Sequence, residues 1–236
     1  MLINRLLQFL DRPKKIPNIP DHIEFQGKRL MRTPHIKFLG IFLEENLNWT
    51  LQINEICNKL KRLFHIFYNI RNFLSNDNIK TIYYTLIYSR IKYGISLYSQ
   101  AGSSKLKRIQ TLQNCLLKVL TRNSKRFSTN ELHNSLDLLK VDDIATQEIV
   151  TFVYNYFSNS LPPVFEGYFE TLASQHGRNT RNGNKLIKII DHKTDIAGLS
   201  TKILGAKLWN KLDNSLKTIP NVKAFKAKFK KHILKY

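Results

Sequence analysis

Three consecutive stretches of this chain carry apolar side chains at the spacing of an amphipathic α-helix. They cover residues 53–70, 79–97 and 106–120. Ser75 and Asp77 offer N-cap chemistry for the second helix, and Ala101-Gly102-Ser103-Ser104 interrupts the chain before the third. Because connections this short leave successive helices antiparallel, the sequence predicts a helical bundle.

An apolar stretch at residues 35–43 precedes the bundle. It is apolar on both faces of an extended chain, which is typical of a buried strand. Gly40 in its middle indicates a bend or a close backbone approach. Leu47-Asn48-Trp49 then forms the turn into the first helix, where we expect Trp49 to pack at the hinge.

More helices are expected after the bundle. Residues 128–131 open one, and Val141-Asp142-Asp143 caps a second that ends before two prolines at 162 and 163. Residues 176–184 are polar and irregular, and residues 185–190 are expected to form a strand. A short helix at 205–212 surrounds Trp209, and a last helix starts at Pro220 and Asn221. We therefore predict a mainly α protein with a small β portion.

The charge of the chain is strongly basic and uneven. The 236 residues carry a formal net charge of +21, with 14 Lys and Arg against 2 Asp and Glu in residues 46–126. Residues 176–236 are also basic, and the stretch between is acidic. Two basic blocks favour two surfaces that face a polyanion, with nucleic acid as the first candidate and an acidic membrane surface as the second.

Other classes of protein fit the sequence less well. No apolar run approaches the ~18 residues of a membrane span, and the first residues lack a signal-peptide pattern. We therefore expect an intracellular protein, nuclear or cytoplasmic, that does not enter a membrane. Cys57 and Cys115 both fall on apolar stripes, which indicates buried reduced thiols, and the scattered histidines add too few ligands for zinc.

Taken in order, the motifs resemble the carboxy-terminal part of reverse transcriptases from non-LTR (LINE-like, jockey/CR1-type) retrotransposons, over roughly residues 35–236. Lys37-Phe38-Leu39-Gly40 and Leu47-Asn48-Trp49 are similar to the primer-grip hairpin of that family. Residues 82–87, Lys92-Tyr93-Gly94 and residues 109–114 are similar to its thumb. Residues 161–165, 178–181 and 205–210 are similar to its carboxy-terminal tail.

The resemblance implies a division of the chain into three parts. Residues 1–46 would be a remnant of the palm with the primer-grip-like strand, residues 47–126 a helical thumb-like bundle, and residues 127–236 a helical carboxy-terminal domain with a basic tail. In this family the palm aspartates that hold two magnesium ions lie before the primer grip. The chain would then be a truncated relic or a fragment of a longer frame.

One acidic pair could stand in for the missing aspartates. In Val141-Asp142-Asp143, however, Lys140 takes the place of the family's aromatic residue, and the pair follows the primer grip instead of preceding it. We interpret Asp142 and Asp143 as acids at a helix start. We therefore expect no catalytic residue, no metal site and no cofactor, since only the absent palm would need magnesium.

The resemblance also implies nucleic-acid-binding residues. Phe38, Leu39 and Gly40 would brace a primer end, although an ordinary buried strand explains the first two equally well. Cations on the helices suit sequence-independent contacts with phosphates, while the usual fate of any one of them is a solvated helix face. The candidate cations are Lys59, Arg62, Arg90, Lys92, Lys105, Lys107, Arg108, Arg178 and Arg181.

These observations predict a fragment of an RNA-directed DNA polymerase that binds RNA, DNA or an RNA–DNA hybrid without sequence preference and does not polymerise. Two alternatives stay open. One is an active polymerase or nuclease whose metal ligands are not recognised. The other is a basic structural or scaffold protein that binds acidic protein partners. The sequence makes no prediction of the oligomeric state.

Overall fold

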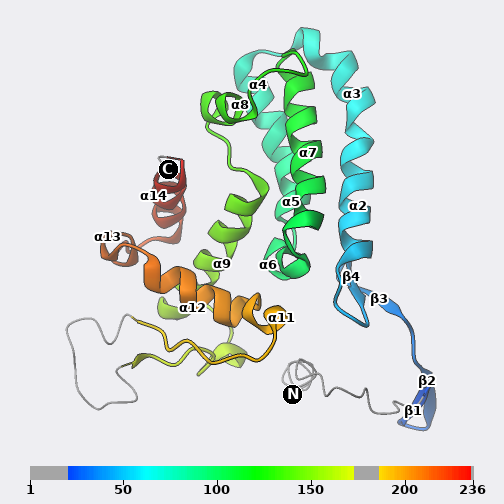
Figure 1. Ribbon diagram of the computed structural model, residues 1–236, viewed down its shortest axis with the longest axis vertical. Coiled ribbons are helices and arrows are strands. Elements are labelled where there is room, and N and C mark those ends of the chain that lie inside the picture. The colour runs from blue at the N-terminus through cyan, green and yellow to red at the C-terminus, as the bar shows by residue number, and fades with distance from the viewer. Residues whose placement is uncertain (1–20, 173–185, 235–236) are drawn as a thin grey trace.

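A computed structural model describes residues 21–172 and 186–234, and it is mainly α-helical with two small β-hairpins in the described part (Figure 1). Strand β1 (His22–Phe25) pairs with β2 (Lys28–Met31), and β3 (His35–Phe38) pairs with β4 (Ile41–Glu44), both antiparallel. The predicted class, mainly α with a small β portion, is confirmed.

The predicted buried strand at residues 35–43 is wrong, because this stretch folds back as the β3–β4 hairpin. Leu39 and Gly40 form the turn with φ values of 46° and 80°, the left-handed pair that a two-residue hairpin requires. The bend expected at Gly40 is therefore present. Only β4 packs on a helix, so Phe38 and Leu39 are left 59% and 74% exposed.

The helical bundle follows as three passes, as the apolar stripes predict. Ser75 caps the second pass, since its hydroxyl accepts a hydrogen bond from the Asn78 N–H at 3.4 Å. The chain turns again at Gly102, where the third pass begins. The first pass consists of α2 (Thr50–Lys61) and α3 (Leu63–Ile70). The second consists of α4 (Asn76–Ile82), a π-helical segment (Tyr83–Tyr88) and α5 (Ser89–Lys92), and the short helix α6 (Ile95–Tyr98) follows it. The third pass is α7 (Ser103–Leu120).

Two helices follow the bundle, α8 (Thr129–Leu136) and α9 (Val141–Phe157). Ser128 caps α8 as predicted, with its hydroxyl 3.4 Å from the Glu131 nitrogen. The predicted acidic cap of α9 is wrong: Lys140 holds the N-cap position, and both aspartates lie in the first turn. The side chain of Gln110 on α7 accepts a hydrogen bond from the Val141 N–H at 2.7 Å, so a side chain from another helix takes one of the unsatisfied N–H groups of this helix start.

The carboxy-terminal helices are α11 (Asp195–Gly198), α12 (Thr201–Lys211), α13 (Asn214–Lys217) and α14 (Val222–Ile233). The predicted helix around Trp209 and the last helix, capped by Asn221, are both confirmed. The predicted strand at residues 185–190 is wrong, since its described part forms only one bridge, Thr171 to Ile187. On the other edge of this segment, the Ile187 N–H donates to the Asn210 side chain and the Ile187 carbonyl oxygen accepts from it, so a side chain of α12 takes the place of a second strand.

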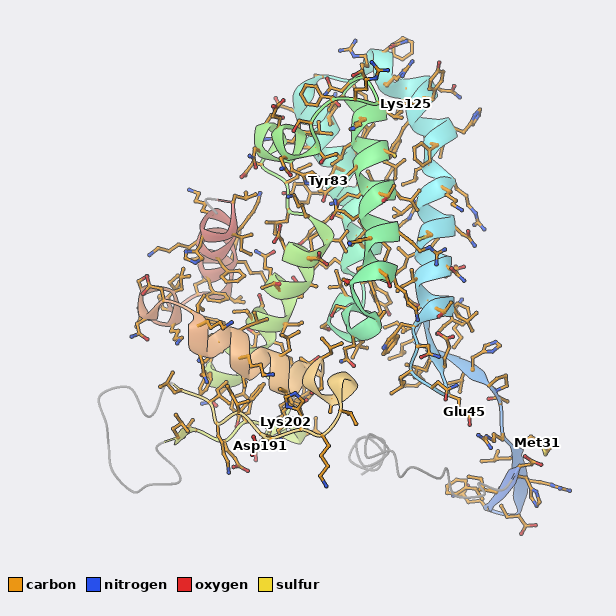
Figure 2. All side chains as sticks on the ribbon, viewed as in Figure 1. Met31, Glu45, Tyr83, Lys125, Asp191 and Lys202 are labelled. Atoms are coloured by element: carbon orange, nitrogen blue, oxygen red, sulfur yellow. The ribbon has the colours of Figure 1, made fainter. Side chains whose placement is uncertain are left out.

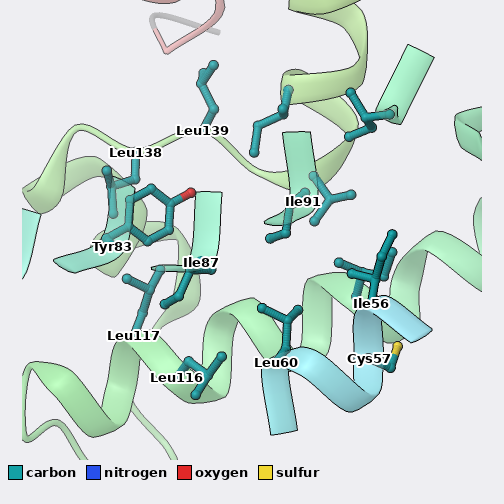
Figure 3. Packing of buried hydrophobic residues seen from close by; sticks show 14 of the residues in the cluster. Ile56, Cys57, Leu60, Tyr83, Ile87, Ile91, Leu116, Leu117, Leu138 and Leu139 are labelled. Atoms are coloured by element: carbon teal, nitrogen blue, oxygen red, sulfur yellow. The ribbon is translucent and has the colours of Figure 1, made fainter. Parts of the chain in front are cut away.

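Helix α9 contributes to two buried clusters. The first cluster runs from Trp49 to Ala145 and fills the bundle (Figure 3), and the second runs from Val150 to Phe229, where α12 and α14 pack on α9. Trp49 is buried at the start of α2, as expected. Cys57 is buried, but Cys115 is exposed, because it lies beside the buried face of α7 and not on it.

Candidate nucleic-acid interface

A pocket lies where the β3–β4 turn, α2 and α5 meet. It brings together three residues that the sequence marks as candidates, Gly40, Lys59 and Arg90, which lie far apart along the chain. The remaining lining residues come from α2 and from the end of the second pass. The full lining is Gly40, Gln52, Ile56, Lys59, Ser89, Arg90 and Tyr93.

Three hydrogen bonds hold the hairpin against the bundle at this pocket. The Tyr93 hydroxyl donates to the Leu39 carbonyl oxygen. The Phe42 N–H donates to Gln52 Oε1 at 2.9 Å, and the Leu51 N–H donates to the Glu44 carboxylate at 3.1 Å. The turn is thus held in a defined position beside the cations of α2 and α5.

Gly94 lets the chain approach the hairpin closely. Its φ is +71°, and a Cβ atom added there would lie 2.6 Å from Cδ1 of Ile41 on β4. A side chain would therefore strain the backbone and clash with the hairpin. The motif Lys92-Tyr93-Gly94 consequently has a structural role, since two of its residues seat the hairpin.

The two cations of the pocket differ in their surroundings. The Arg90 guanidinium donates to the Lys59 carbonyl oxygen at 3.3 Å, which fixes its side chain across α2. The ammonium group of Lys59 lies 3.3 Å from the Glu55 carboxylate, one turn earlier. Glu55 therefore compensates part of the positive charge near Lys59, and Arg90 is the better placed of the two for an anion.

A second group of cations lies along the contact between α2 and α7, which pack side by side (Figure 1). The Lys105 ammonium group donates to the Asn48 carbonyl oxygen at 2.6 Å and to the Thr50 hydroxyl at 3.0 Å. Burial raises the pKa of the Cys57 thiol, and the positive charges of Arg108 and Lys61 oppose the rise. Lys61 was not predicted as a site residue, but its place one turn after Cys57 on the same side of α2 is readable from the sequence.

The other predicted residues are not gathered at these two places. Arg62 and Lys107 are exposed, and Lys107 lies about 100° round α7 from Arg108. Lys92 forms an ion pair of 3.3 Å with Glu148 on α9. Phe38 at the end of β3 and Leu39 in the turn are exposed, and neither lines the pocket. Arg178 and Arg181 lie outside the described residues.

The thumb-like motif at residues 109–114 has a packing role. Gln113 is fully buried, and its side-chain amide donates to the Tyr83 hydroxyl at 2.7 Å and to the Leu139 carbonyl at 2.9 Å. Gln110 donates to Asn114 at 2.8 Å, and Asn114 in turn meets His133. These polar side chains tie α7 to the second pass and to α9, so they are not available to a ligand.

Within residues 21–172 and 186–234, no group of three or more His, Cys, Asp and Glu side chains is arranged to hold a metal ion. Asp142 and Asp143 occupy the first turn of α9, where the helix dipole favours acids. Burial raises the pKa of Asp143. Among the described helices, none has both the length and the apolarity that crossing a membrane takes.

Comparison with known proteins gives one partial similarity. The chain is 30% identical over 110 residues to the probable RNA-directed DNA polymerase from transposon X-element of Drosophila melanogaster. The matched stretch covers 45% of this chain and 12% of that protein. No family model matches the chain, and no solved structure matches it. The similarity supports a relation to reverse transcriptases.

Proposed function

We propose that this chain is a nucleic-acid-binding part of a non-LTR reverse transcriptase and binds RNA, DNA or their hybrid without sequence preference. Residues 47–126 would act as its thumb-like bundle. The observation that carries the proposal is that cations gather at two places, Lys59 and Arg90 beside the anchored hairpin turn, and Lys61, Lys105 and Arg108 along the contact between α2 and α7. The partial similarity to a transposon polymerase supports the same reading.

The placement of the cations suits phosphate contacts. Lys105 and Arg108 lie about one turn apart on a rigid 18-residue helix, and Lys61 approaches from α2. Arg90 is fixed in the pocket on the other side of α2. Charges held on helices can follow a sugar-phosphate backbone without reading bases, so affinity would depend on charge and salt more than on sequence.

We infer that the described part does not itself catalyse polymerisation. The acidic pair nearest to the family motif, Asp142 and Asp143, lies in the first turn of α9, and Asp143 is half-buried. A polymerase needs carboxylates that share metal ions at the primer end. A primer-extension assay of the full chain with magnesium on an RNA template tests this, and template-dependent synthesis would overturn it.

The binding itself is tested by titrating the full chain into fluorescently labelled RNA, DNA and hybrid of equal length while the salt concentration is varied. We expect similar affinities for different sequences and a slope of log K against log salt of about −3 or steeper. That slope corresponds to roughly four or more phosphate contacts on a single strand. Absent or salt-insensitive binding would favour the scaffold alternative, a protein that meets acidic protein surfaces.

A further inference from the structure

The end of the bundle where α3 stops and α4 begins carries exposed aromatic side chains. Phe73 is 85% exposed and Tyr68 is 60% exposed, and the Arg71 guanidinium lies over the Tyr68 ring at 4.0 Å from its centroid. We call Tyr68, Arg71 and Phe73 the aromatic tip. Neither the pocket nor the contact between α2 and α7 includes any of them.

The aromatic tip is held in position by its neighbours. Phe67, next to Tyr68, is fully buried in the bundle, which fixes α3 with Tyr68 facing outward. Leu74, next to Phe73, packs against the same core, and the following residue, Ser75, caps α4. The Tyr68 ring is therefore held on the end of α3, and the Phe73 ring on the short turn of residues 71–73 that follows it. Because the Phe73 ring is in contact with water, a ligand that covers it would gain the free energy of burying apolar surface.

The charge around the tip selects the kind of ligand. The end of α7 and the segment that follows it carry Lys118, Arg122, Lys125 and Arg126 and no Asp or Glu, while one acid, Asp77, lies four residues after Phe73 in the first turn of α4. Lys125 follows α7 at the same end of the molecule, as Figure 2 shows, and its carbonyl oxygen is bound by the Lys118 ammonium group at 2.7 Å. Exposed rings beside an excess of cations match a ligand that has both flat apolar faces and negative charge.

We propose that the aromatic tip is a stacking platform for the bases of single-stranded nucleic acid, with the phosphates drawn by Arg71 and by the cations that follow α7. The inference rests on the proposed function and deepens it, because it names the strandedness of the ligand and a site for it. Bases paired in a duplex already stack on each other, whereas unpaired bases stack on aromatic side chains and on arginine planes.

The experiment compares variants of the full chain on three probes of about 12 nucleotides, within the usual site size. The probes are an oligouridine strand, an abasic strand of equal charge, and an RNA duplex. We expect Phe73→Ala and Tyr68→Ala each to weaken oligouridine binding by about 5- to 100-fold, the effect of losing one stacked base. Binding of the abasic strand and of the duplex should not change, nor should the salt slope for oligouridine.

Two conservative variants separate ring stacking from general apolar contact. Phe73→Trp should keep the affinity, and Phe73→Leu should lose it although its side chain is similarly apolar. Both native tryptophans, Trp49 and Trp209, are buried. The indole that F73W introduces is therefore the one that bases can reach directly, and we expect oligouridine but not the abasic strand to quench its emission. Val164→Ala, another exposed apolar side chain, is the control and should bind as the native chain does.

The possible failures are distinguishable. If the native chain binds none of the probes at moderate salt, the proposed function fails. If it binds them but Phe73→Ala and Tyr68→Ala leave oligouridine affinity unchanged, only the stacking platform is overturned, and the exposed rings would then suit a protein partner. If the native chain binds the oligouridine strand and the abasic strand with equal affinity, the stacking platform is overturned in the same way.

Discussion

The Tyr93 hydroxyl donates a hydrogen bond to the backbone carbonyl oxygen of Leu39, a residue 54 positions earlier in the chain. This bond joins the tip of the β3–β4 hairpin to the end of the second helical pass. Gly94 follows and lies against Ile41 of the same hairpin. The position of the turn over the pocket thus depends on two consecutive residues, Tyr93 and Gly94.

Gly94→Ala is expected to destabilise the protein by about 2–3 kcal/mol, mainly from the left-handed backbone and to a smaller extent because the Cδ1 end of Ile41 must move. Gly167→Ala is the matched control, because Gly167 has a φ of +69° but no atom within 4 Å of an added Cβ. It should cost only about 1–2 kcal/mol. Urea unfolding measures both, and equal losses would contradict the role of the Ile41 contact.

Gln113→Leu should cost about 1–3 kcal/mol of unfolding free energy, because it leaves buried polar partners, the Tyr83 hydroxyl and the Leu139 carbonyl, without their donor. Adding Tyr83→Phe removes one of those orphaned groups. The double variant should therefore lose less than the sum of the two single variants. Strict additivity in the same unfolding assay would argue against the direct bond.

Stability is expected to fall as the pH drops below about 6.5 because of His133. Burial lowers the pKa of this buried ring from its ordinary value of 6.5, against the opposing effect of the Leu138 carbonyl at 3.2 Å from Nδ1. The unfolded chain therefore takes up a proton at a higher pH than the folded one. The contribution of the neutral His133 ring to the unfolding free energy is complete above about pH 6.5, and it is lost as the pH falls from there toward the pKa of the ring in the folded protein.

Urea midpoints between about pH 5 and pH 8 test this, with His133→Gln as the comparison. The glutamine variant should be less stable at the high end, because it disturbs the bond of 2.9 Å to Asn114. It should, however, lose less stability than the native chain on acidification. Parallel pH profiles for the two proteins would show that His133 does not carry the effect.

Arg108→Gln should weaken RNA binding at about 0.1 M salt and reduce the salt slope by about one unit, as expected for the loss of one phosphate contact. Lys188→Gln is the control, because Lys188 pairs with Glu170 outside the bundle, at 3.5 Å. It should leave the slope unchanged. An unaltered slope for Arg108→Gln would remove this residue from the interface.

Local signals account for what the sequence predicts well. Ser75, Ser128 and Asn221 mark helix starts because each side chain can satisfy an N–H group within its own first turn. The apolar stripes then predict which faces are buried. None of these inferences needs knowledge of a distant part of the chain.

The failures concern features decided by distant partners. An apolar stretch at residues 35–43 fits a buried strand and an exposed hairpin equally, and the choice depends on the left-handed turn at Leu39 and Gly40. Likewise, the sequence pattern does not show which of the two cations Arg90 and Lys92 lines the pocket and which is paired with an acid. Only the fold brings Glu148 of α9 to Lys92, while it directs Arg90 across α2 to the pocket.

Helix α9 has a consequence for how the protein forms during synthesis. One part of α9 completes the core of the bundle, and another part is covered by segments that come later in the chain, which are the stretch around Phe169, Ile187, α12 and α14. On a ribosome, the bundle with the start of α9 can assemble first, while Val153 waits for α12 and Tyr154 waits for Phe225 of α14, on which its ring stacks. That interval is when the nascent chain exposes the most apolar surface of α9, and when a chaperone would have a reason to bind it.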